Sequence, residues 1–166
     1  MDKTGLTLLA LWIHVPFVTA WIGLVMLDLV VALVPGLEPE QRGRMIAWSR
    51  PFVVLAIIVI MITGIWQTMF NPFSEVMSYE ALERLRTVTL YGMLLFWKHG
   101  FVLATFALTY ATRFMLAPRL LAPVSANGQR HDPERVLRSI SWIAAANLFA
   151  CLGALLLATR MVWELH

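Results

Sequence analysis

The sequence predicts an all-α integral membrane protein in which four transmembrane helices form an up-down bundle. Of the 166 residues, 60% are hydrophobic and 14% are charged. A soluble domain is closer to half apolar, with about a quarter of its residues charged. The mean hydropathy is +0.74, and the apolar residues gather in four long stretches. Because so few charged side chains cannot cover a water-facing surface, we expect the lipid bilayer to surround most of the chain.

The four stretches are residues 4–27, 51–74, 87–112 and 139–159, and Lys98 is the one charged residue within them. Each is long enough to cross a hydrocarbon core about 30 Å thick at a rise of about 1.5 Å per residue. Allowing for helical ends, we expect helices over about 4–34, 45–70, 87–117 and 136–162, which form a single membrane domain over residues 1–166. The first stretch is too long for the apolar part of a secretory signal, so we expect it to remain in the protein.

The connections between the spans contain signals for further local structure. Pro39 follows a Pro-Gly turn and can open a short helical turn that runs through Arg44. Pro72 ends the second span, and Ser78 then caps a segment with one apolar and one charged face. This segment predicts a short interfacial helix between the second and third spans. In the third loop, Asp132 precedes a proline and is expected to cap the last span.

The charge distribution predicts how the chain is oriented in the membrane. Most of the 13 Lys and Arg residues lie in the first and third loops. The positive-inside rule places these loops in the cytoplasm and both termini outside. The net charge of +3 is too dilute to indicate a nucleic-acid partner. The single cysteine, Cys151, lies in an apolar run, so no disulfide is possible within the chain and a packing role is expected.

Polar residues within the spans are the candidates for function, because ionisable groups are costly in a bilayer. His14 and His99 lie at similar depths in the first and third spans, which point the same way. Each histidine follows a tryptophan in the pattern W-x-H, as in Trp97-Lys98-His99. Two such imidazoles can approach a planar ligand from opposite faces, which is the geometry of a bis-histidine haem b. The alternative is that each histidine only forms a hydrogen bond between helices.

Other residues near these histidines have expected roles. Trp21 and Trp97 are among the aromatic residues that would wall a bound haem. Lys98 needs an anion at this depth, and a propionate, a substrate carboxylate or a quinone oxygen would serve; its side chain can also reach toward the surface. Asp28 is expected to pair with Arg113 or Arg50 near the cytoplasmic end. Asn147 is expected to bridge two helices.

Copper is the rival ligand. The chain has 9 Met and 4 His residues, and soft thioether ligands suit Cu(I). The methionines are scattered, however, with no M-x-x-M or H-x-x-M pattern. His131 and His166 lie outside the spans, where solvation is expected.

Several short motifs together resemble the copper resistance protein D family of bacterial membrane proteins. They are His14, Trp21 and Gly23 in the first span, Thr63-Gly64 in the second, Tyr91-Gly92 through Lys98 in the third, Arg113, Pro118-Arg119-Leu120, and Leu137-Arg138-Ser139. The first motif is also similar to the four-helix membrane protoporphyrinogen oxidases. The family resemblance implies copper uptake or tolerance in the bacterial inner membrane. The oxidase resemblance implies haem b binding and porphyrin oxidation through His14 and Lys98, although Asp28 stands where an arginine-bearing end of the span is expected.

From these observations we expect a b-type haem redox protein, with His14 and His99 as metal ligands and Lys98, Trp21 and Trp97 as further cofactor contacts. It would transfer electrons between a quinol or periplasmic donor and a partner, a role compatible with an oxidoreductase, and no catalytic residue is assigned. The alternatives are a copper transport or resistance protein, a porphyrin-oxidising haem protein, and an accessory subunit of a larger membrane complex. A homo-oligomer is compatible with each of them.

Overall fold

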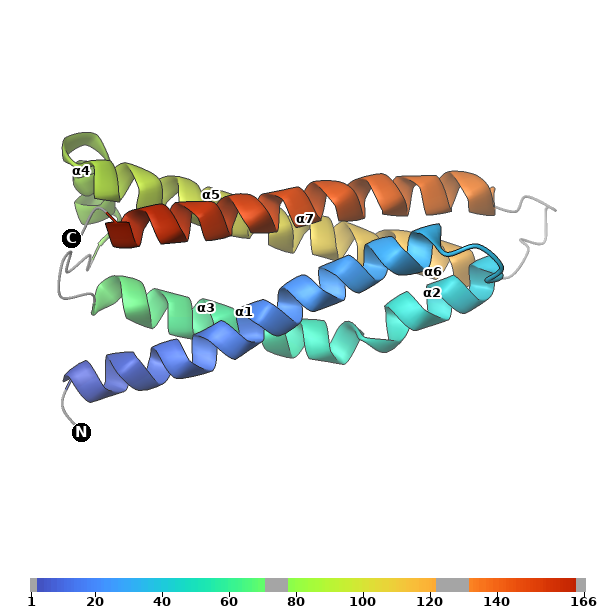
Figure 1. The fold of residues 1–166 in the computed structure, drawn as a ribbon, viewed down its shortest axis with the longest axis horizontal. Coiled ribbons are helices and arrows are strands. Elements are labelled where there is room, and N and C mark those ends of the chain that lie inside the picture. The colour runs from blue at the N-terminus through green and yellow to red at the C-terminus, as the bar shows by residue number, and fades with distance from the viewer. Residues whose placement is uncertain (1–2, 71–77, 122–131, 164–166) are drawn as a thin grey trace.

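The computed structural model describes residues 3–70, 78–121 and 132–163, and these residues are almost entirely helical. Within them, four segments are long and apolar enough to cross a membrane: Gly5–Leu33, Pro39–Met69, Leu90–Leu121 and Pro133–Met161. Successive segments alternate in direction, so α1 begins and α7 ends at the same end of the molecule (Figure 1). The predicted all-helical, four-span architecture is confirmed at this level.

The helices are α1 (Lys3–Leu33), α2 (Pro39–Trp48), α3 (Arg50–Met69), α4 (Tyr79–Val88), α5 (Leu90–Tyr110), the π-helix η1 (Ala111–Leu116), α6 (Ala117–Leu121) and α7 (Pro133–Trp163). The second span therefore consists of α2 and α3, and the third consists of α5, η1 and α6. Sequence reasoning predicted each of these spans as one continuous helix. The structure instead interrupts regular α-helix at Ser49 and over residues 111–116.

The second span starts earlier than residue 45. The backbone N–H of Glu38 donates to the Gln41 Oε1 atom at 3.1 Å, and Pro39 occupies the first helical position. The short helical turn predicted after Pro39 is thus the start of α2. The interruption at Ser49 follows from Pro51, which has no N–H to donate to the carbonyl four residues earlier.

The short helix predicted between the second and third spans is present as α4. The Ser78 side chain accepts a hydrogen bond from the Ala81 backbone N–H at 3.1 Å, which confirms the predicted cap. Two leucines of α4 pack against a buried cluster of α5 and α7 residues. On the charged face, the hydrogen bond from Arg86 lowers the pKa of the Glu83 carboxyl. The location of α4 at a membrane surface remains a prediction.

The helices pack more completely at one end of the bundle than at the other. α1 contacts α3 and α7, and α5 contacts α7 and α4. At the end that carries α2, which we call the α2 end, one buried cluster joins residues of α1, α2, α6 and α7. At the opposite end, the α4 end, the buried cluster of described residues joins α4, α5 and α7. There the pair α1 and α3 diverges from the pair α5 and α7 (Figure 1).

The corner between α4 and α5 gives a first prediction. A Cβ atom at Gly92 would lie 2.3 Å from the backbone carbonyl of Leu85, whereas one at Gly100, also in α5, would have nothing within 4 Å. We expect Gly92→Ala to reduce the free energy of unfolding by about 1–3 kcal/mol, since backbone must shift. Gly100→Ala should be neutral or stabilising by up to about 1 kcal/mol. Thermal unfolding of the two purified variants checks this, and equal melting temperatures would contradict it.

Candidate functional site

His14 is held against the second span by a hydrogen bond through its Nδ1 atom. Its Nδ1 atom lies 2.7 Å from the Thr63 Oγ1 atom, and that hydroxyl lies 2.6 Å from the Val59 carbonyl oxygen. A hydroxyl has one proton, which Thr63 donates to the carbonyl, so His14 Nδ1 must donate to Thr63. In the neutral imidazole this hydrogen bond leaves the lone pair on Nε2. The ring also lies beside Gly64 of α3, where an added Cβ would be 3.5 Å from His14 Cε1, an ordinary van der Waals distance.

His99 has the same tautomer for a different reason. Its Nδ1 atom lies 2.7 Å from the backbone carbonyl oxygen of Leu95. Since a carbonyl oxygen only accepts, Nδ1 carries a proton, and in the neutral ring Nε2 carries the lone pair. Histidines that bind metals nearly always donate their other ring N–H to such a partner. Both histidines thus have the hydrogen bonding of a metal ligand, and both are half-buried.

The first and third spans carry matching residues at intervals of about two helical turns. These are His14, Trp21 and Asp28 on α1, and His99, Phe106 and Arg113 on α5 and η1. The two helices meet at two of the three levels. The Trp21 and Phe106 ring centroids are 5.0 Å apart, and Arg113 Nη2 lies 2.8 Å from Asp28 Oδ1. By the same spacing the two histidines form the third level, toward the α4 end, where α1 diverges from α5 (Figure 1). There His14 contacts Thr63 and His99 contacts Leu95.

Lys98 lies beside this level and is half-buried. Its ammonium group interacts electrostatically with both the His14 and the His99 imidazoles. Among the residues that the structure describes, it forms no ion pair. Its predicted anionic partner is therefore not a described side chain, and a ligand in that role stays a prediction.

The two tryptophans expected beside the cofactor lie in different surroundings. Trp21 is 4% exposed and belongs to the central cluster of α1, α3 and α7. Trp97 is 56% exposed, on the outside of the described chain. A side chain in that position is suited to contact lipid. Contact of either residue with a cofactor stays a prediction.

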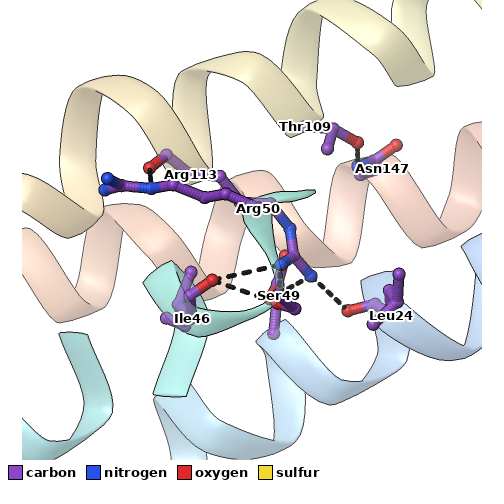
Figure 2. Close-up of polar contacts among 8 residues, drawn as sticks. Leu24, Ile46, Ser49, Arg50, Thr109, Arg113 and Asn147 are labelled. Atoms are coloured by element: carbon purple, nitrogen blue, oxygen red, sulfur yellow. Dashed lines mark hydrogen bonds and ion pairs between the residues drawn. The ribbon is translucent and has the colours of Figure 1, made fainter. Parts of the chain in front are cut away.

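Among the residues that the structure describes, the most deeply buried polar side chain is Arg113 of η1, which is 0% exposed (Figure 2). Its guanidinium donates to the Leu24 carbonyl at 3.0 Å, the Ile46 carbonyl at 3.1 Å, Asp28 Oδ1 at 2.8 Å, and Ser49 Oγ. We call these five residues the Arg113 cluster. The expected pairing of Asp28 with Arg113 or Arg50 is confirmed, and the partner is Arg113.

Other polar predictions are also confirmed. Asn147 Nδ2 donates to Thr109 Oγ1 at 2.8 Å and so bridges α7 and α5 (Figure 2). Cys151 is 5% exposed and packs in the central cluster. Arg50, the other candidate partner of Asp28, instead donates through Nε to the Arg113 carbonyl at 2.9 Å, a contact that was not predicted.

Sequence reasoning missed two features of the cluster. It gave no role to Ser49, and it did not predict the irregular turn at η1 that contains Arg113. The available signal for the break at Ser49 was Pro51, whose missing N–H marks a helix start in the middle of a span.

Among the described residues there is no group of three or more His, Cys, Asp and Glu side chains able to hold a metal ion. His131 and His166 lie outside the described residues.

Comparison with known proteins identifies the family. The sequence profile of the copper resistance protein D family matches residues 43–161, which is most of the chain. The chain belongs to the copper resistance protein D family. The match includes Lys98, His99 and Arg113 of this family member, whereas His14 and Trp21 precede it. No curated protein and no solved structure matches the chain. The resemblance to this family is thus confirmed, and the likeness to the protoporphyrinogen oxidases stays a prediction.

Proposed function

We propose that this protein binds copper within its helical bundle through the Nε2 atoms of His14 and His99, and that it acts in copper transport or tolerance. The observation that carries the proposal is the shared tautomer of the two histidines. Each Nδ1–H is occupied by a fixed acceptor, 2.7 Å away in both cases, which directs the basic Nε2 atom to a ligand. Family membership supports copper as that ligand.

Two imidazoles suit copper as cargo. Imidazole is a good ligand for copper, and Cu(I) accepts few ligands. A transported ion must bind firmly enough to enter and weakly enough to leave. Two neutral ligands satisfy both needs better than a closed cage of three or four. The described residues contain no such larger cage.

Haem b is the second candidate, and Lys98 is the observation that favours it. The ammonium group interacts with both imidazoles, so its charge opposes a bare cation at that level. A haem would bring propionates that pair with Lys98, while His14 and His99 served as axial ligands. In that case the protein would be a redox protein with a quinol or periplasmic partner, and porphyrin oxidation would be one form of that chemistry.

The composition of the purified protein tests the proposal. We expect protein purified in mild detergent from copper-supplemented cells to carry stoichiometric copper and to show no Soret band when reduced. A Soret band with a sharp α-band would show that the bound group is haem b and not copper. Protein that holds neither group, but purifies with fixed membrane partners, would indicate an accessory subunit and would overturn both metal proposals.

A further inference from the structure

We propose that the Arg113 cluster is a gate that closes the α2 end of the bundle to the passage of copper. The idea rests on the proposed transport function, because a transported ion that binds at the histidine level must pass this cluster to reach the α2 end. A single guanidinium joins α1, α2, the α2–α3 junction and η1 there. No other described side chain links so many elements.

Two residues of the Arg113 cluster lie where the helices are irregular. Ser49 separates α2 from α3, and Arg113 itself is in the π-helix. Interruptions of this kind are the points at which helices bend, and π-helical turns are frequent at functional sites. Loss of the hydrogen bonds from Arg113 to Ile46 and Ser49 would therefore free α2 to move relative to α3. The link is electrostatic and directional, unlike the apolar packing around it.

The two ends of the bundle differ as a gated path requires. At the α2 end, apolar residues of α1, α2, α6 and α7 form one cluster next to the Arg113 cluster. At the α4 end, α1 and α3 diverge from α5 and α7 (Figure 1). The histidine level lies on the α4 side of the Trp21–Phe106 contact. The described arrangement is thus closed beyond the histidines and less tightly joined on their other side.

Several polar atoms beside the gate have no hydrogen-bond partner within the described chain. They are Arg113 Nε, Thr112 Oγ1 and Asn147 Oδ1, and all three are buried. Unpaired buried polar groups are unfavourable and are rare in a single stable arrangement. A second arrangement that hydrates or pairs these atoms would compete with the first. Two packings of similar stability are the physical basis of a switch.

The native cysteine provides the test. Cys151 lies about one helical turn beyond Asn147, toward the α4 end, and is buried in the central cluster. A small membrane-impermeant thiosulfonate, which modifies cysteine, would be applied to sealed vesicles of each orientation. The vesicles would contain the unmodified protein or one of the variants Asp28→Asn and Ser49→Ala. Opening the gate should increase the rate of Cys151 modification about tenfold or more, and only from the side that carries α2. Glu40→Gln, which breaks an exposed pair at the same end, is the matched control.

The outcomes distinguish opening of the gate from general loosening of the bundle. They also distinguish failure of the gate from failure of the proposed copper function. Increased modification from both sides means that the bundle has loosened, which overturns the gate. The gate is also overturned if Cys151 is modified at an unchanged rate in both Ser49→Ala and Asp28→Asn, whatever the copper content of the protein. One-sided opening supports the gate, and it does so even in protein that holds no copper, where only the proposed function fails. If Asp28→Asn does not fold, the Ser49→Ala rate decides alone.

Discussion

Replacement of Asp28 by Ala is expected to lower the free energy of unfolding by about 3–5 kcal/mol, because it leaves a buried guanidinium without its counter-charge. Arg113 is 0% exposed and Asp28 is 2% exposed, so water cannot replace the lost carboxylate without entry into the bundle. The three remaining acceptors of Arg113 are neutral. Denaturation of the detergent-purified protein, followed by helical circular dichroism, measures the change.

Two further variants show whether the loss comes from the buried charge. Glu40→Ala breaks an exposed pair whose side chains are 68% and 58% exposed, and it should cost less than about 1 kcal/mol. The double variant Asp28→Leu with Arg113→Met removes both charges and should recover much of the stability lost in Asp28→Ala. If Asp28→Ala were as stable as Glu40→Ala, the ion pair would have no structural importance.

Replacement of His14 or His99 by Ala is expected to remove bound copper, because a single imidazole remains at the site. The more informative change is Thr63→Val, which keeps the shape of the side chain but removes the acceptor for His14 Nδ1–H. Loss of such a supporting partner typically weakens metal binding about 10–100-fold. Copper titration against a competing chelator measures the affinity of each variant.

His131→Ala is the matched control for these histidine variants, since it removes an imidazole from a loop outside the predicted spans. Its copper content should equal that of the unmodified protein. Full copper retention in His99→Ala would show that α5 does not supply a copper ligand through His99. Full affinity in Thr63→Val would show that the His14 tautomer does not depend on α3.

The spans could be predicted from the sequence because they depend on long apolar runs, and the pairing of Asp28 was narrowed to two arginines. The choice between Arg50 and Arg113 could not be made. Both residues lie near the same end of the bundle, and the π-helical turn shifts the register of η1. No residue in the third span signalled this turn, so a regular helix was expected there.

The candidate site was also predicted only in part. The similar depths of His14 and His99 follow from counting residues along parallel helices. The Thr63 contact depends on how α1 packs on α3, which no sequence pattern specifies. Trp97 precedes His99 by two residues, and each residue turns the helix by about 100°. Proximity in sequence therefore did not place both side chains on the same face, and Trp97 lies on the outside.

X-ray absorption at the copper edge tests the central claim most directly, because it reports the ligands of the bound metal. For the copper-loaded protein, the account predicts nitrogen ligands with the outer-shell scattering of two imidazoles. Any copper that remains bound to the His99→Ala variant should show the scattering of one imidazole. A first shell of sulfur atoms, or a spectrum without imidazole scattering, would contradict it.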